Sequence, residues 1–208
     1  FKKMESYSGG GDDFRGDSGP LKVHRSIPKD PLSLAFIKAG KEAGYKETDD
    51  ISGYCQEGFG IFDRTVFKGE RWSASRGYLD PVRDRKNLTI ITNALVCKLT
   101  FEGNVAKGVY FKNKRNKIIN VSARKEVILS AGAVGSPHIL MLSGIGPGED
   151  LKNLGIEVVS DLVGVGKNLQ DHLQARPVFK TDLSTINTET SNYVKKALIV
   201  LHKEFKLD

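Results

Sequence analysis

The sequence predicts an α/β fold with an added antiparallel sheet, and three observations support this prediction. Residues 88–121 contain three runs rich in β-forming residues, separated by polar turns. Residues 126–133 (EVILSAGA) contain a continuous apolar run that ends in small residues. A helix-forming segment follows directly, which is typical of a buried parallel strand covered on both faces. With 208 residues, 39% of them hydrophobic, the chain is long enough to bury a core.

The first third of the chain is rich in turns. Residues 1–20 are a polar, glycine-rich segment, and residues 21–23 predict a short strand. A helix is expected to begin at Pro31, because proline suits the first helical turn and Asp30 can cap it. Gly44 is expected to end this helix.

A meander of three antiparallel strands is expected next. The strands are predicted over residues 88–101, 105–111 and 118–121. Residues 102–104 (EGN) separate the first two and are typical of a hairpin turn.

The apolar run at residues 127–129 is interpreted as a central parallel strand that ends at Ala131 and Gly132. Ser136 is expected to cap the next helix and Pro137 to be its first residue. The remaining predicted elements are a helix over residues 149–154, a strand over residues 156–160 and a helix over residues 188–205.

Composition excludes several classes of protein. The net charge is +7, but the basic residues are scattered among acids, which argues against a nucleic-acid partner. Residues 127–148 carry no formal charge, yet their prolines, glycines and histidine argue against a membrane span. Two cysteines cannot form a disulfide scaffold, and no signal peptide is visible, so a cytoplasmic location is expected.

No self-contained active site is visible in the motifs. The chain has no G-x-G-x-x-G and no Walker loop, and its histidines lack the spacing of metal ligands. Asp171 and His172 suggest either a catalytic pair or, more simply, a hydrogen-bonded pair that fixes a loop. The small residues Ala131 and Gly132 suit either the approach of a ligand or close packing of a helix on a strand.

Residues 133–146 (AVGSPHILMLSGIG) resemble the second signature of the glucose–methanol–choline (GMC) oxidoreductases. Further short motifs of this chain resemble motifs of the family and occur in the same order along the sequence. Among the family's members, those resembling choline dehydrogenase are the most similar to this chain. These motifs occupy residues 16–23 (GDSGPLKV), 56–59 (QEGF), 69–75 (GERWSAS), 78–81 (YLDP), 85–88 (RKNL) and 163–172 (VGVGKNLQDH).

The resemblance implies a flavoprotein that binds FAD and oxidises a small-molecule alcohol by hydride transfer to flavin N5. By position, Val96 corresponds to a valine that contacts the adenine through its backbone, and Ala131 and Gly132 correspond to the strand end near the cofactor. Residues 168–172 resemble a loop that helps to seat the flavin. The alcohol, the electron acceptor and the oligomeric state stay open.

The resemblance also implies part of a Rossmann-like FAD-binding domain, which holds the antiparallel meander, together with segments of an α+β substrate domain. The expected division is a substrate-domain segment at residues 1–66, an FAD-domain segment at 67–170 and a second substrate-domain segment at 171–208. The family's phosphate-binding turn is missing and its catalytic histidine would lie beyond Asp208, so an internal fragment without catalytic residues of its own is expected. A basic binding module and a GMC-fold pseudoenzyme are the alternatives.

Overall fold

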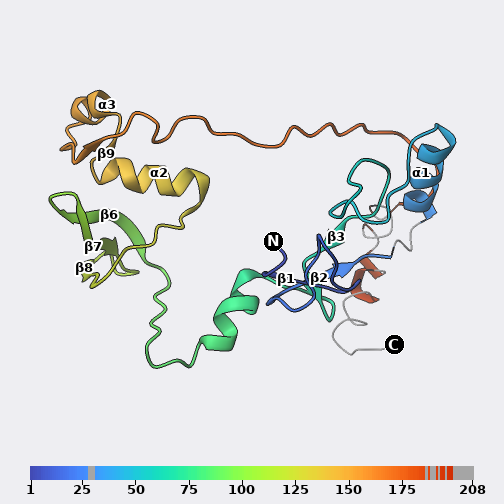
Figure 1. The fold of residues 1–208 in the computed structure, drawn as a ribbon, viewed down its shortest axis with the longest axis horizontal. Helices are drawn as coiled ribbons and strands as arrows, with labels where there is room; N and C mark the ends of the chain where they lie inside the picture. The colour runs from blue at the N-terminus through green and yellow to red at the C-terminus, as the bar shows by residue number, and fades with distance from the viewer. Residues whose placement is uncertain (28–30, 186, 188–190, 192, 195, 199–208) are drawn as a thin grey trace. The chain divides into compact units, whose positions relative to one another are not determined.

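A computed structural model of the chain describes residues 1–27, 31–185, 187, 191, 193–194 and 196–198. The chain divides into two compact units, which Figure 1 shows as a ribbon coloured along the sequence. The first unit comprises residues 1–88 and residues from 178 onward, and the second unit comprises residues 89–177. The division into cofactor-domain and substrate-domain segments stays a prediction.

A small mixed sheet organises the first unit, in the order β1-β2-β3. β1 runs parallel to β2, with Glu5 opposite Leu21, and β2 runs antiparallel to β3. A separate hairpin of β4 and β5 follows β3. The strand bounds are Glu5–Tyr7 (β1), Leu21–Arg25 (β2), Asp63–Arg64 (β3), Val66–Phe67 (β4) and Glu70–Arg71 (β5).

The helices of the first unit are short. The helix predicted from Pro31 is confirmed as α1, Pro31–Glu42, and Gly44 follows it at φ +87°, a conformation that glycine adopts readily. A π-helical turn, η1 (Ser75–Leu79), leads into a 3₁₀ turn, η2 (Asp80–Val82). The helix predicted over residues 188–205 lies largely outside the described residues.

The predicted meander is confirmed in the second unit as an antiparallel sheet in the order β6-β7-β8. β6 begins at Leu95 rather than at residue 88, because Lys112 at the end of β7 already lies opposite Leu95. The residues before Leu95 therefore have no partner on β7, and Asn93 at φ +54° interrupts the extended run. The bounds are Leu95–Glu102 (β6), Val105–Lys112 (β7) and Ile118–Ser122 (β8).

The prediction of a central buried strand at residues 127–129 is wrong for this structure. Residues 126–130 are not in a strand, and the side chain of Ile128 is 78% exposed. A parallel strand needs neighbours that receive its backbone hydrogen bonds, and the sheets of the described residues offer none to this segment. Apolar composition alone therefore does not make it a strand here.

The helix that follows, α2 (Gly132–Leu142), begins five residues earlier than predicted. Ser136 and Pro137 lie inside α2 and do not start it, so the predicted capping role of Ser136 is wrong. The Ser136 hydroxyl instead accepts a hydrogen bond from the Ala131 N–H at 3.0 Å. This contact still holds the chain at the beginning of the helix.

The second unit ends in a compact strand–helix–strand segment. β9 pairs in parallel with β10, and α3 lies between them in the sequence, which confirms the second predicted helix. The strand predicted over residues 156–160 is wrong except at residue 160, where β10 begins. The Ile156 N–H instead donates to the Leu151 carbonyl and closes the end of α3. The bounds are Ile145–Gly146 (β9), Gly148–Asn153 (α3) and Ser160–Asp161 (β10).

Candidate functional site

Val96 lies near the beginning of β6, half-buried and opposite Phe111 of β7. Among the described strands β6 has one neighbour, so its other edge carries backbone groups without a strand partner. The register shifts between Val96 and Lys98, which marks a bulge beside Val96. An open edge next to a bulge is a place where a ligand can meet the backbone.

A buried serine holds α2 against β6. The Ser143 hydroxyl accepts a hydrogen bond from the Leu99 N–H at 2.8 Å and donates one to the Ile139 carbonyl at 2.5 Å. Leu99 and Ser143 are both buried, and α2 packs on β6. Since the N–H of Leu99 points to Ser143, the edge of β6 away from β7 faces α2 at this residue.

Ala131 is the residue before α2, its N–H donates to the Ser136 hydroxyl, and Gly132 is the first residue of the helix. The first N–H groups of an α-helix have no carbonyl partner within the helix. Gly132 has φ +84°, and a Cβ added there would meet no atom within 4 Å. The residue therefore combines a backbone conformation that favours glycine with open space beside it. Among the described residues, no neighbouring element therefore packs closely against Gly132, and the positive φ by itself accounts for the glycine.

The three residues assigned to the cofactor thus lie on two elements that pack on each other. Val96 lies near the beginning of β6, and the pair Ala131–Gly132 begins α2. A direct hydrogen bond between Val96 and this pair is absent from the described contacts. Whether the three contact FAD stays a prediction.

The loop at residues 163–172 contacts α2 through Met141. A Cβ on Gly166 would lie 3.3 Å from Met141 Cε, and both Gly166 and Asn168 have positive φ. Asp171 accepts a hydrogen bond from the backbone N–H of His172 at 2.8 Å. The described contacts thus join the Asp171 carboxylate to the backbone, which favours the loop-fixing interpretation of this pair.

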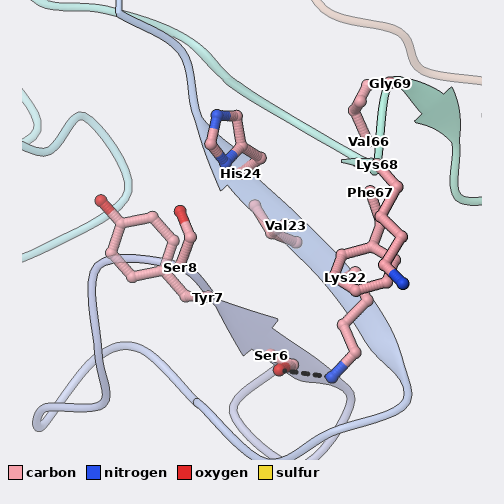
Figure 2. Close-up of a pocket in the computed structure, with 10 residues that line it drawn as sticks. All are labelled: Ser6, Tyr7, Ser8, Lys22, Val23, His24, Val66, Phe67, Lys68 and Gly69. Atoms are coloured by element: carbon pink, nitrogen blue, oxygen red, sulfur yellow. Dashed lines mark hydrogen bonds between the residues drawn. The ribbon is translucent and has the colours of Figure 1, made fainter. Parts of the chain in front are cut away.

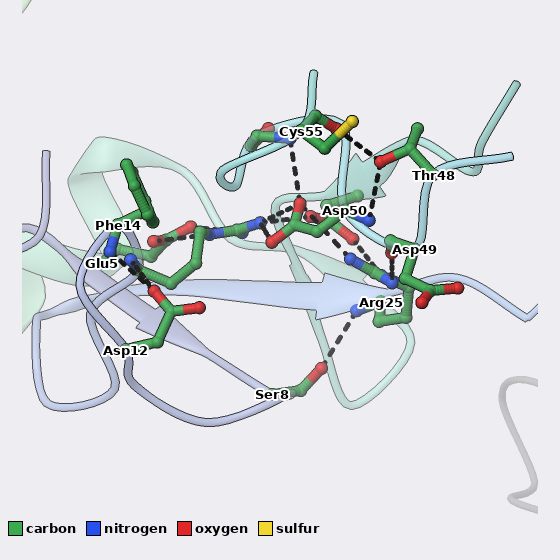
Figure 3. A network of polar contacts seen from close by, with 12 residues as sticks. Glu5, Ser8, Asp12, Phe14, Arg25, Thr48, Asp49, Asp50 and Cys55 are labelled. Atoms are coloured by element: carbon green, nitrogen blue, oxygen red, sulfur yellow. Dashed lines mark hydrogen bonds and ion pairs between the residues drawn. The ribbon is translucent and has the colours of Figure 1, made fainter. Parts of the chain in front are cut away.

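The sequence patterns did not reveal an ion-pair network in the first unit (Figure 3). Arg15 is 3% exposed and makes five hydrogen bonds to the carboxylates of Glu5, Asp50 and Asp63, at 2.6–3.1 Å. Arg25 pairs with Asp63 at 2.8 Å. Only tertiary structure could reveal this set, because its members are up to 58 residues apart, from Glu5 to Asp63.

The network shifts the pKa values of Arg15 and of the adjacent Tyr7. The hydrogen bonds that Arg15 donates to Glu5, and then those to Asp63 and Asp50, hold the pKa of Arg15 above its ordinary value despite the opposing effect of burial. Burial, with the charge of Asp63, raises the pKa of Tyr7 above 10.0. The Arg15 guanidinium lies 3.8 Å from the centre of the Tyr7 ring, in a cation–π contact. These effects favour the charged form of Arg15 at the centre of a structural cluster.

Two hollows were also missed by the sequence patterns. One, of about 440 Å³, lies at the beginning of β6 and is lined by Leu95, Lys112 and Asn116 among others. The other, of about 450 Å³, lies in the first unit between β2 and the β4–β5 hairpin (Figure 2). Neither could be found from the sequence, because each is lined by segments distant along the chain.

The described residues contain no group of three or more His, Cys, Asp or Glu side chains arranged to hold a metal ion. Within the same part of the chain, no helix combines the length and apolar character needed to cross a bilayer.

The mixed α/β fold, together with the signature segment at residues 133–146, is typical of one class of oxidoreductase. Residues 1–174 match the family model described as GMC oxidoreductase. The chain therefore belongs to the GMC oxidoreductase family. The family resemblance of the sequence and the mixed α/β fold class are thereby confirmed.

Curated relatives with high similarity carry choline dehydrogenase names. The chain is 51% identical over 176 residues to an oxygen-dependent choline dehydrogenase of Staphylococcus xylosus, with 84% of this chain covered. It is 49% identical over 175 residues to the mitochondrial choline dehydrogenase of Homo sapiens. The chain spans 31% and 29% of these two relatives, so each is about three times the length that matches.

Solved structures agree with the fold. An FAD-dependent oxidoreductase from Chaetomium thermophilum has a TM-score of 0.83 and 32% identity, over 100% of this chain and 39% of that one. A pyridoxine 4-oxidase from Mesorbium loti has a TM-score of 0.67 and 33% identity, over 77% of this chain and 32% of that one.

Proposed function

We propose that this chain forms part of the FAD-binding region of a GMC-type oxidoreductase that oxidises an alcohol, with choline as the foremost candidate substrate. The single observation that supports this most strongly is the 49–52% identity to choline dehydrogenases over 84% of the chain. The named FAD-dependent structural neighbour supports the choice of cofactor.

The described residues fit a flavin dinucleotide in three respects. β6 has a strand neighbour on one edge only among the described strands, so backbone groups near Val96 on the other edge would be available to the flat edge of an adenine, for which a valine side chain is not required. The space beside Gly132 is one that any larger side chain would fill. The free N–H groups at the beginning of α2 would stabilise negative charge placed near them.

The roles of this chain's residues are then to bind and to position. The chemistry that FAD supplies when bound is acceptance of hydride from the alcohol carbon. Val96 would orient the adenine, Ala131 and Gly132 would leave room for the cofactor, and the Leu99–Ser143 contact would keep β6 and α2 in their relative position. We assign no catalytic base to this chain.

The direct test uses the protein expressed from its complete reading frame. We expect purified protein with the visible absorption of a bound flavin and with choline-dependent reduction of a dye acceptor. A simple primary alcohol serves as the comparison substrate. Flavin-free protein with no turnover of any alcohol would overturn the proposal, whereas turnover of another alcohol alone would overturn only the choice of choline.

A second experiment uses residues 1–208 by themselves with added FAD. We expect no turnover and weak flavin binding, because the chain lacks the glycine-rich turn on which a dinucleotide's diphosphate normally rests. The absence of a general base would lower the rate by a further factor of about 10²–10⁴. Stoichiometric flavin with measurable turnover would show that this segment holds a complete site.

The cytoplasmic location stays a prediction, which microscopy of a tagged full-length protein would check.

A further inference from the structure

The hollow of about 450 Å³ in the first unit is large enough for a small organic molecule. Figure 2 shows residues of β1 and β2 on one side of it and the β4–β5 hairpin on the other. These segments are about 40 residues apart along the chain, from Val23 to Val66. Tertiary structure therefore creates this hollow.

The charges that line this hollow are of one sign. The ammonium groups of Lys22 and Lys68 lie 6.0 and 5.6 Å from the centre of the Phe67 ring. No acid is among the described residues that line it. The acid next in sequence, Glu70, is paired with Arg76. The described lining residues therefore supply two lysine cations and no carboxylate.

The N–H groups of the Lys22 ammonium can bind an anion. Its ammonium donates to the Ser6 hydroxyl at 3.0 Å, and that hydroxyl donates to the Asp17 carbonyl at 2.9 Å. An ammonium carries three N–H groups, so the contact to Ser6 uses one of them and holds the group in place.

The rest of the wall is largely apolar. Val23 and Val66 contribute aliphatic surface, and the rings of Tyr7 and Phe67 contribute aromatic surface. Phe67 is 39% exposed although Trp72 packs edge-on against it at 5.2 Å between ring centres. Such a wall would accept the apolar body of a ligand whose charged end meets the lysines.

The backbone of Lys68 provides an independent observation. Lys68 and Gly69 are the two central residues of the β4–β5 hairpin, at φ +49° and +73°. Two positive φ values define a turn that favours Asn-Gly, and a lysine is uncommon in this conformation. Residues in such sparsely populated conformations cluster at ligand sites and switch regions, so the backbone of Lys68 supports a role for its side chain.

We propose that this hollow binds a small organic carboxylate with an apolar body. The carboxylate lies between the ammonium groups of Lys22 and Lys68, and the apolar body lies against Val23, Val66 and Phe67. This proposal does not depend on the proposed function, because it concerns a ligand other than FAD and residues of the first unit only.

Trp72 gives a direct measurement of binding. It is the only tryptophan in the chain, and its ring contacts Phe67 at the hollow. The 208-residue chain is titrated with cyclohexanecarboxylate, which does not absorb where tryptophan is excited, and Trp72 fluorescence is recorded. The neutral cyclohexanecarboxamide and inorganic phosphate are titrated in parallel. We expect saturable binding of the carboxylate, with the amide and phosphate each at least about fivefold weaker.

The variant Lys68→Asn separates binding from folding. Asparagine suits the turn, so the thermal midpoint should stay equal or rise while affinity for the carboxylate falls about fivefold. Lys22→Met should weaken binding similarly. Lys125→Asn, an exposed lysine of the second unit, removes the same charge and should leave affinity unchanged. Equal affinities for carboxylate and amide, phosphate binding as tight as the carboxylate's, or an equal loss in Lys125→Asn would overturn the proposal.

Discussion

Replacing Arg15 by methionine should destabilise the first unit strongly. The substitution keeps most of the side-chain volume but removes five hydrogen bonds to three carboxylates. The side chains of Glu5, Asp50 and Asp63 are only 15%, 21% and 7% exposed, so they would be left together with little access to water. Arg25 pairs with Asp63 and Asp50 and leaves Glu5 without a cation.

The expected loss follows from this burial. Removing one partner of a buried ion pair typically costs about 3–5 kcal/mol, because an uncompensated charge remains. Arg15→Lys keeps the charge but loses the planar fork that reaches three carboxylates, so it should cost less than Arg15→Met. A matched surface control is Arg83→Met, because Arg83 pairs with Asp80 at 2.7 Å with side chains 55% and 48% exposed, and it should cost at most about 1 kcal/mol.

Urea unfolding followed by Trp72 fluorescence reports on the first unit, since the chain has one tryptophan and it lies there. With an m-value of about 1–3 kcal/mol per molar, a loss of about 3–5 kcal/mol in Arg15→Met should lower the urea midpoint by roughly 1–5 M. Arg15→Lys should fall between Arg15→Met and Arg83→Met. If Arg15→Met and Arg83→Met unfold at the same midpoint, the network does not stabilise the unit and the reasoning is refuted.

Three further predictions concern the cofactor residues and pH. In the full-length protein, Val96→Pro should lower flavin occupancy about fivefold, because proline lacks the backbone N–H donor. Val96→Ile keeps this donor and should leave occupancy unchanged. Equal occupancy in the two variants would exclude a backbone contact. Gly132→Ala and the control Gly155→Ala, which has φ +72° and equally open space, should each cost about 1–2 kcal/mol, but only Gly132→Ala should release flavin. Because the folded state raises the Tyr7 pKa above 10.0, unfolded chains lose this proton first, so stability should fall as pH rises from roughly 9 to 11. Tyr7→Phe should reduce that alkaline loss in the Trp72 assay, and an unchanged pH slope would contradict it.

The sequence predicted those elements whose cause is local. Pro31 and Gly44 bound α1 as expected, because the φ preferences of proline and glycine act within a few residues. The hairpin of β6 and β7 was also predicted, since its turn lies at residues 103–104 between two β-rich runs. The family was identified from signature words, which are likewise local.

The apolar run at residues 127–129 shows why other predictions failed. Its composition suits a buried strand, but a strand exists only where neighbours accept its hydrogen bonds. The described sheets provide no such neighbours, and Ile128 is exposed. Similarly, β6 begins at Leu95 because β7 ends at Lys112, opposite Leu95. The residues before Leu95 contain no signal for this boundary.

By itself, then, the sequence determined the family, the meander and α1. It also indicated Val96, Ala131 and Gly132 as candidate cofactor residues. Signature motifs, turns and helix caps are formed by residues close together in the sequence, so they can be recognised without the tertiary structure. Only the tertiary structure decided that Arg15 gathers three carboxylates and that Lys22 and Lys68 face one hollow. Hydrogen bonds and charges act through space over a few ångströms. The partners of these groups therefore depend on how segments that are distant in the sequence pack together, and a local pattern of residues does not predict that packing.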